Sequence, residues 1–433
     1  MQILIKKIVY PGRSLADTDG KVVFTDEGLP GEVVEVEPLR ERASYIEART
    51  VGIIEPSARR VEPRCGHFRA CSPWQNMEYA LQLEVKAGQV REIFSRELRV
   101  DLDRLEVVPS PKIWGYRNRA RFHVLWQDNE PFAAYHEPGS EAAFIRTERC
   151  ELVPDEMNGL LGAVIGGIGK GDLRGLTDIE IRRSAADGRM LISLGMGSGA
   201  EPGAVREVFG RLKDDYPLAG IVGLLNDRKK TSQVQLLGKG FVEENVAGTR
   251  FRIGAQSFFQ VNIEQLAAVA GEMRRIAAAS EEPRIADLYC GIGTFGVLLA
   301  PGAKEVFGVE SEEANIRFLK RNLTQNGVGN YSVCEGTSEE WIGEILDRNI
   351  DLIILDPPRK GVAPDLARAL ADDPVRTLIY LSCNPATLVR DLKILLGAYE
   401  LAEVKVFDFF PHTPHIETLT ILNRACPLVT VQE

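Results

Sequence analysis

The stretch from Ile285 to Glu310, IADLYCGIGTFGVLLAPGAKEVFGVE, decides the fold of this chain. An apolar run enters a glycine-rich turn, a helix-forming segment follows, and a second apolar run ends at Glu310. A strand, a tight turn, a helix and a second strand form a βαβ unit, in which the two strands lie parallel. Ligands of such sheets bind outside the carboxyl ends of the strands, so we expect the functional residues there.

The same alternation of strand and helix patterns continues to the end of the chain. It ends in two strand-like runs, LAEVKVFDFF and ETLTILNRA, which read as a hairpin-like addition. This order predicts a Rossmann-like α/β domain over residues 263–433, with a mostly parallel sheet. We see no internal repeat.

Two further regions precede this domain. Residues 1–55 contain short Val- and Ile-rich runs separated by Pro-Gly and Asp-Gly breakers, which predicts a small β-barrel. Residues 56–262 contain a helical run near 77–94 and strand-like runs over 105–250, which predicts a central α+β region.

Composition narrows the class of protein. The chain has 433 residues, 44% of them hydrophobic and 26% charged, as in soluble globular proteins. No apolar run approaches the roughly 20 residues that cross a bilayer, and the start lacks the order of a signal peptide. Seven scattered cysteines argue against a disulfide scaffold. We therefore expect a cytoplasmic protein without membrane contact, and we expect a monomer.

The glycine turn predicts a nucleoside site. Gly291, Gly293 and Gly296 match G-x-G-x-x-G, and Glu310 follows Gly291 by nineteen residues. Glycines let the backbone approach a ligand, and an acid at that distance can accept hydrogen bonds from both ribose hydroxyls. On these residues, S-adenosylmethionine (SAM) and a nicotinamide dinucleotide are both open.

Two later strand ends predict catalytic groups. Cys383 follows an apolar strand and precedes a helix in Ser-Cys-Asn-Pro, a place for a thiol nucleophile whose pKa the helix N-terminus can lower. Glu417 precedes the apolar run TLTIL, where a partly desolvated carboxylate suits proton abstraction. The alternatives are a buried structural cysteine and a surface glutamate.

Taken in order, DLYCGIGTFG, GVE, LDPPRKG, LSCNPATLVRD and FPHTPHIET resemble the RNA 5-methyluridine methyltransferase family. The upstream AQSFFQVN resembles the family's entry to its methyltransferase domain, and residues 1–55 resemble a TRAM domain, a small RNA-binding barrel. The resemblance covers nearly the whole chain. It implies transfer of a methyl group from SAM to C5 of a uridine in RNA.

The resemblance also implies roles for individual residues. Cys383 resembles the nucleophile and Glu417 the general base. The remaining residues implied to contact the cofactor or the target base are Gln260, Tyr289, Gly291, Glu310, Asp356 and Phe258.

A group of cysteines resembles the iron–sulfur site of family members that act on ribosomal RNA. Cys65 and Cys71 have the spacing of its first two ligands, and Cys150 resembles its fourth. The third cysteine is absent, with Trp74 or Ser72 at its place. A 4Fe–4S cluster, a zinc ion and a site without metal are the three alternatives.

The net charge of the chain is −10, so contacts with RNA phosphates must come from local groups of basic residues. Alternation in RNRAR would put Arg117, Arg119 and Arg121 on one face of a strand. A second basic group includes Lys229 and Lys230. Arg182 and Arg183 form a third candidate patch, and each patch could instead be an ordinary solvated strand face.

The RNA itself remains open at this stage. The TRAM-like start favours a 23S ribosomal RNA target over the T-loop of tRNA, while the missing cysteine weakens that assignment. Two hypotheses of other classes are a catalytically silent RNA-binding module and a nicotinamide-dependent oxidoreductase.

Overall fold

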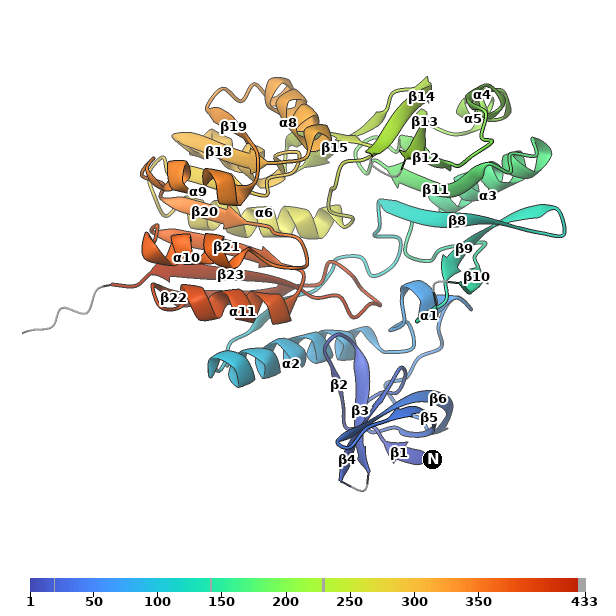
Figure 1. The fold of residues 1–433 in the computed structure, drawn as a ribbon, viewed down its shortest axis with the longest axis horizontal. Coiled ribbons are helices and arrows are strands. Elements are labelled where there is room, and N and C mark those ends of the chain that lie inside the picture. The colour runs from blue at the N-terminus through green and yellow to red at the C-terminus, as the bar shows by residue number, and fades with distance from the viewer. Residues whose placement is uncertain (19, 141, 228–229, 427–433) are drawn as a thin grey trace, which may run out of the picture.

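The computed structural model describes residues 1–18, 20–140, 142–227 and 230–426. Three sheets organise them: a strand-rich N-terminal unit, a central sheet and an α/β sheet, seen at the bottom, upper right and left of Figure 1. None of the helices in these ranges is long and apolar enough to cross a membrane.

The N-terminal unit is a curled six-stranded sheet with the strand order β1-β5-β6-β4-β3-β2. Alternate residues of β5, such as Val34 and Val36, are buried with Ile3 and Val23 in a small apolar core. The strands are β1 (Gln2–Leu4), β2 (Lys7–Val9), β3 (Arg13–Thr18), β4 (Lys21–Thr25), β5 (Val33–Glu41) and β6 (Tyr45–Glu55).

The central sheet has seven strands in the order β10-β9-β8-β11-β12-β13-β14. All neighbours pair antiparallel except β12 and β13, which run parallel. Leu160 of α3 and Phe209 of α4 pack with strand residues such as Ile181 in one core, so these helices cover one face. The elements are β8 (Arg119–Gln127), β9 (Glu130–His136), β10 (Phe144–Arg146), α3 (Asp155–Lys170), β11 (Leu176–Arg183), β12 (Met190–Met196), α4 (Pro202–Phe209), α5 (Leu212–Asp215), β13 (Leu218–Asp227) and β14 (Lys230–Gly238).

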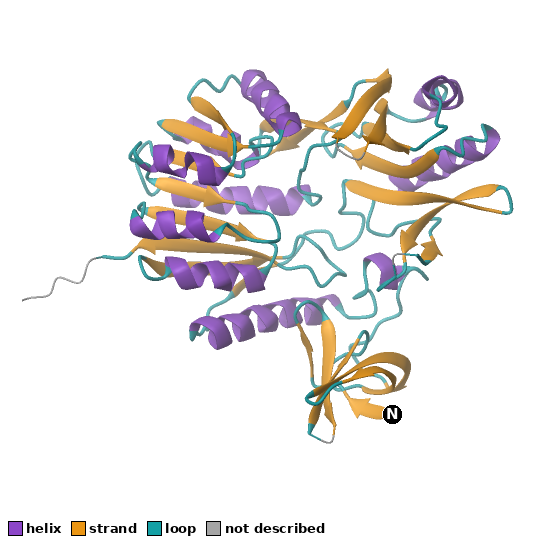
Figure 2. Ribbon diagram, in the orientation of Figure 1, coloured by secondary structure: helices purple, strands orange, loops and turns teal. Residues whose placement is uncertain are grey.

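The α/β sheet has eight strands in the order β19-β18-β17-β20-β21-β23-β22-β7. The first five are parallel, and β23 lies antiparallel between β21 and β22. Helices cover both faces of this sheet in Figure 2, which confirms the predicted Rossmann-like class. Its C-terminal elements are α6 (Ile263–Ala277), β17 (Arg284–Leu288), α7 (Thr294–Leu299), a 3-10 turn (Ala300–Gly302), β18 (Glu305–Glu310), α8 (Glu313–Asn326), β19 (Tyr331–Glu335), α9 (Ser338–Leu346), β20 (Leu352–Leu355), α10 (Pro364–Asp372), β21 (Thr377–Ser382), α11 (Pro385–Leu395), β22 (Tyr399–Phe407) and β23 (Glu417–Arg424).

Segments of the stretch 56–262 also pack with this sheet. The strand β7 (Glu106–Val108) pairs with the edge strand β22, and α2 (Tyr79–Leu98) buries Val90 and Phe94 against the sheet. The hairpin of β15 (Phe241–Val246) and β16 (Thr249–Gly254) joins the core on the other face. The strand β7 covers the edge of β22, which would otherwise be open to pairing with another chain. The helix α2 buries its apolar face by packing against the sheet. The short α1 (Phe68–Cys71) lies beside the central sheet.

A buried ion pair joins α2 to the loop between β22 and β23. The Nζ of Lys86 donates to Oδ1 of Asp408 at 2.6 Å, and both side chains are fully buried. The hydroxyl of Tyr79 donates to the other carboxylate oxygen at 2.8 Å. Because an unpaired buried charge is costly, this network fixes the loop that leads to Glu417.

Candidate active site

A cavity of about 740 Å³ lies at the carboxyl ends of β17, β18, β20 and β21. It brings together every residue for which the sequence predicted a catalytic, cofactor or base-pocket role. These lining residues are Phe258, Gln260, Tyr289, Gly291, Glu310, Asp356, Cys383 and Glu417. The cavity therefore lies where ligands of open α/β sheets bind.

The glycine turn forms one wall of the cavity. Tyr289 and Gly291 have φ angles of 61° and 59°, in the left-handed region. A Cβ on Gly291 would meet no atom within 4 Å, so a ligand can approach the backbone there. A Cβ on Gly293 would lie 2.3 Å from Cδ1 of Leu319, so this glycine allows α8 to pack closely.

Backbone donors hold Glu310 at the end of β18. Its Oε2 accepts from the N–H of Gly291 at 2.9 Å, and its Oε1 accepts from those of Ser311 and Glu312 at 2.9 and 2.7 Å. Each carboxylate oxygen has two lone pairs, so one acceptor position, on Oε2, remains for a ligand hydroxyl. A ligand hydroxyl in the cavity can therefore donate to Glu310.

Cys383 lies between the end of β21 and the start of α11 and is half-buried. The next residue, Asn384, is the N-cap of α11, and its Oδ1 accepts from the N–H of Ala386 at 3.1 Å. Burial, followed by the charge of Glu417, raises the pKa of the Cys383 thiol to about 11, and Arg359 opposes this shift. The thiol of the free protein is therefore protonated at neutral pH, and a thiolate there is basic and reactive.

Glu417 is the first residue of β23 and only 2% exposed. Burial and the nearby Asp356 raise its pKa well above the usual range, while Arg359 lowers it. Burial also raises the pKa of Asp356 to about 7. Carboxyl groups with raised pKa values are suited to proton transfer near neutral pH.

The segment that follows β19 has no acid at position 337, where the family resemblance would place one for the base of a nucleoside. Thr337 there is the N-cap of α9 and forms a capping box with Glu340, so its hydroxyl is occupied. Glu339, two residues later, lines the cavity, and one of its carboxylate oxygens accepts from the hydroxyl of Tyr289 at 3.2 Å. The sequence Thr-Ser-Glu-Glu (337–340) contains both the capping residue Glu340 and the cavity residue Glu339. Two adjacent glutamates look alike in sequence, so the pattern alone does not show which one faces the cavity.

Only two of the three arginines of RNRAR lie on the strand. Arg119 and Arg121 lie on β8, and Arg121 forms an ion pair with Asp178 at 3.2 Å. Arg117 precedes the strand, and its Nε donates to the hydroxyl of Tyr116 at 3.3 Å. The alternation argument was wrong for Arg117, because the strand begins only at Arg119.

The second basic group is described only in part. Lys229 lies outside the described residues, and Lys230 is the first residue of β14. Arg182, from the third patch, is 1% exposed, and its Nη2 donates to the carbonyl of Ser257 at 3.0 Å. Arg182 is therefore a buried residue that stabilises the loop containing Phe258, and the side chain of Phe258 is 58% exposed.

The cysteine group does not fit a cluster. Gln75 donates to the sulfur of Cys65 at 3.3 Å and to Oγ of Ser72 at 2.7 Å, and that Oγ lies 3.3 Å from the sulfur of Cys71. Trp74 packs into a separate apolar cluster with Met77. In the described ranges, no three His, Cys, Asp or Glu side chains are arranged to hold a metal ion. The sulfurs of Cys65 and Cys71 thus have hydrogen-bond partners within the protein, and the thiol of Cys71 also lies against that of Cys150.

Comparison with known proteins decides the family. Residues 78–425 match the model of the tRNA (Uracil-5-)-methyltransferase family. The chain belongs to this family. An RNA methyltransferase of Listeria monocytogenes is 31% identical over 98% of this chain and 97% of its own, and one of Thermosynechococcus vestitus is 29% identical over 98% of both chains. Both of these relatives are described as uncharacterized.

A solved structure is similar over almost the whole length. It is a Pyrococcus abyssi tRNA (uracil-54, C5)-methyltransferase in complex with S-adenosyl-L-homocysteine. The TM-score is 0.76 at 25% identity, and the match covers 98% of this chain and 100% of that one. The protein is thus a SAM-dependent RNA (uracil-5-)-methyltransferase. This excludes the nicotinamide-dependent oxidoreductase and the silent RNA-binding module.

Proposed function

We propose that this protein methylates C5 of a uridine in structured RNA, with Cys383 as nucleophile and Glu417 as general base. The observation that carries the proposal is that this thiol and this carboxyl line the same cavity as the glycine turn and Glu310. Thiol, base and cofactor loop come from three separate strand ends, and all three chemical roles require proximity to one pyrimidine ring.

The cavity fits SAM. Gly291 leaves open space beside the backbone, and the buried end of β18 supplies the Glu310 carboxylate. Gln260, Tyr289 and Asp356 line the same volume. When bound, SAM supplies an electrophilic methyl group. We assign Glu310 to the ribose hydroxyls, and Glu339 to the adenine side of the site.

Cys383 begins the reaction. The thiol first loses its proton to solvent. The thiolate then forms a bond to C6 of uracil, and the electrons of the C5–C6 double bond move to the carbonyl oxygen at C4, which makes C5 nucleophilic. Arg359 is the cation whose charge favours the thiolate. C5 gains the methyl group as the bond from that methyl to the sulfonium sulfur breaks, with S-adenosyl-L-homocysteine as the leaving group. The Glu417 carboxylate then takes the proton from C5. The C5–C6 double bond then re-forms as the bond from carbon to sulfur breaks.

The target base has to leave its stack to reach Cys383. Phe258 lines the cavity and is the most exposed aromatic side chain there, so we assign it to contact with the target or a neighbouring base. Arg119 and Arg121 on β8, with Lys229 and Lys230, are our candidates for phosphate contacts. We assign no step to an iron–sulfur cluster, because the donor set around Cys65 does not fit one.

Two RNAs are candidates for the substrate. The TRAM-like N-terminal unit favoured 23S ribosomal RNA, with the T-loop of tRNA as the alternative. The similar Pyrococcus abyssi enzyme acts on uracil 54 of tRNA and aligns with 98% of this chain, so most of residues 1–55 have a counterpart there. The N-terminal unit therefore does not discriminate between the two RNAs, and both remain candidates in the cytoplasm.

The test supplies the purified protein with SAM and with unmodified transcripts of 23S ribosomal RNA and of tRNA. Mass spectrometry of nuclease digests then maps 5-methyluridine. We expect one or a few uridines in one RNA class to become methylated. Absence of 5-methyluridine from both RNAs, with SAM bound to the protein, would contradict the proposal.

A further inference from the structure

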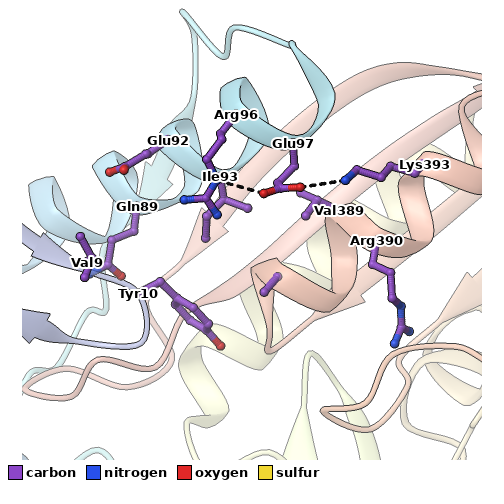
Figure 3. Close-up of a pocket in the computed structure, with 11 residues that line it drawn as sticks. Val9, Tyr10, Gln89, Glu92, Ile93, Arg96, Glu97, Val389, Arg390 and Lys393 are labelled. Carbon is purple, nitrogen blue, oxygen red and sulfur yellow. Dashed lines mark hydrogen bonds and ion pairs between the residues drawn. The ribbon is translucent and has the colours of Figure 1, made fainter. Parts of the chain in front are cut away.

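The turn between β2 and β3 of the N-terminal unit reaches the catalytic loops. This turn, Tyr10-Pro11-Gly12, is hereafter the β2–β3 turn. The carbonyl of Ile8 just before it accepts from Nε2 of Gln89 on α2 at 3.1 Å. Tyr10 lines a cavity of about 410 Å³ together with residues of α2 and α11. Figure 3 shows the labelled lining residues. The other side of the Tyr10 ring packs against the apolar core on this face of the α/β sheet.

That contact joins the two ends of the molecule. The hydroxyl of Tyr10 lies 3.0 Å from Oδ1 of Asn384, which is 374 residues away and directly follows Cys383. Burial and the neighbouring Cys383 raise the pKa of Tyr10, so the phenol keeps its proton and donates it to the amide oxygen.

Asn384 in turn fixes the groups around the thiol. Its Oδ1 also accepts from the first N–H groups of α11, and its Nδ2 donates to the carbonyl of Arg359 at 3.1 Å. Its backbone N–H donates to Oγ of Ser382 at 3.2 Å. Cys383 therefore lies between Ser382 and Asn384, which are hydrogen-bonded to each other. The backbone of Arg359 is hydrogen-bonded to the side chain of Asn384.

The turn also touches the loop that leads to Glu417. A Cβ on Gly12, whose φ is 114°, would lie 2.5 Å from Cβ of Pro414, three residues before that carboxylate. In the same loop, His415 lies within 3.4 Å of Nη2 of Arg359. One turn of the N-terminal unit thus contacts both loops that present the proposed catalytic pair.

We propose that the N-terminal unit is part of the catalytic apparatus, and that Tyr10 is a positioning residue which orients Cys383 through Asn384. This rests on the proposed function of Cys383, and it assigns to residues 1–55 a role beyond contact with RNA. The side chain of Tyr10 does not react. Its hydrogen bond keeps the thiol and the guanidinium of Arg359 in the arrangement that favours addition to C6.

The test compares Tyr10→Phe with Tyr45→Phe in the full-length protein. Tyr45 is the matched control, because its ring packs on Phe24 within the N-terminal unit, away from Asn384. For Tyr10→Phe we expect kcat to fall roughly tenfold with an unchanged KM for RNA, since misplacing a reacting group slows the chemical step. Tyr45→Phe should retain the wild-type kcat. An unchanged kcat in Tyr10→Phe, or a change confined to KM, would overturn the inference.

A second measurement does not depend on RNA. Peptide mass spectrometry follows alkylation of Cys383 by iodoacetamide, with the exposed Cys426 as the internal reference. In Tyr10→Phe we expect Cys383 to react about threefold faster, because the loosened loop exposes the thiol more often, while Cys426 is unaffected. Equal Cys383 rates in the two proteins would overturn the inference. Failure of the proposed function would instead appear as a wild-type protein that methylates no RNA.

Gly12→Ala provides a larger displacement of the same turn. The added methyl group cannot fit beside Pro414 without movement of one of the two loops. We expect the same loss of kcat as in Tyr10→Phe or a greater one, at a melting temperature that shows a folded protein. A folded Gly12→Ala variant with wild-type kcat would also contradict the role of the β2–β3 turn.

Discussion

The cavity that we propose as the active site and the cysteine group differ in what surrounds their reactive side chains. Both sets were predicted from residues far apart in the sequence. The cavity leaves about 740 Å³ among Cys383, Glu417 and the glycine turn. Gln75 donates a hydrogen bond to the sulfur of Cys65, and a hydrogen bond joins Ser72 and Cys71. Convergence of suitable residues is thus not enough for a site, because a site also needs room and groups free to bind.

The largest effect should follow removal of the thiol from the cavity. Cys383→Ala leaves nothing to add to C6, and we expect methyl transfer from radiolabelled SAM to RNA to fall by at least about 10³-fold. Cys426→Ala, which removes an exposed thiol far from the cavity lining, is the control and should keep full activity. Appreciable transfer by Cys383→Ala would place the nucleophile elsewhere.

Removal of the base should stop the reaction at a later step. In Glu417→Gln the thiol still adds to C6, but the proton on C5 has no acceptor, so release of methylated RNA should slow by about 10²-fold. Denaturing gels should then show protein that stays attached to RNA. Glu400→Gln changes an exposed carboxylate on β22 and should behave as wild type. Normal release by Glu417→Gln would remove Glu417 from this role.

The pH dependence of Cys383 should reflect its surroundings. Burial and Glu417 raise the thiol pKa to about 11, so alkylation of the free protein should increase about tenfold per pH unit between pH 7 and 9, with the thiolate fraction. The Arg359 cation lowers this pKa. Arg359→Ala should therefore raise it further and slow alkylation at any fixed pH in this range. A rate independent of pH would mean that the thiol is already ionised.

The smallest effect should come from the cysteine group. Protein purified without oxygen should contain far less iron and sulfide than a 4Fe–4S cluster requires. Cys65→Ala should change kcat less than about twofold, because it removes a hydrogen-bond acceptor and no catalytic group. Iron in stoichiometric amount, with visible absorbance that disappears in Cys65→Ala, would show that the cysteine group binds a cluster and would contradict this prediction.

Local patterns predicted the C-terminal part of the fold well. The run IADLY became β17, EVFGVE became β18, and the hairpin-like end became β22 and β23, because alternation and glycine turns act over short distances. The cavity-lining residues were also found from sequence. Tyr289, Glu310, Asp356 and Cys383 lie at or just after the ends of parallel strands, and the topology of parallel sheets brings such ends together. Glu417, at the start of an antiparallel strand, was found from its apolar neighbours instead.

Long-range contacts were not predictable in the same way. Nothing in Glu106–Val108 indicates that it pairs with β22, and nothing in Lys86 indicates Asp408 as its buried partner. Arg117 looked like part of a basic strand face until the start of β8 was known. The contact of Tyr10 with Asn384 joins residues whose local patterns are independent. Such pairs depend on how the units dock.

One measurement tests the central claim most directly. RNA that contains 5-fluorouridine has no proton to give up at C5, so a nucleophile that adds to C6 remains attached after methyl transfer. Incubation of the protein with this RNA and SAM, followed by peptide mass spectrometry, should locate the covalent adduct on Cys383. An adduct on another residue, or none under conditions in which the protein methylates ordinary RNA, would contradict the account.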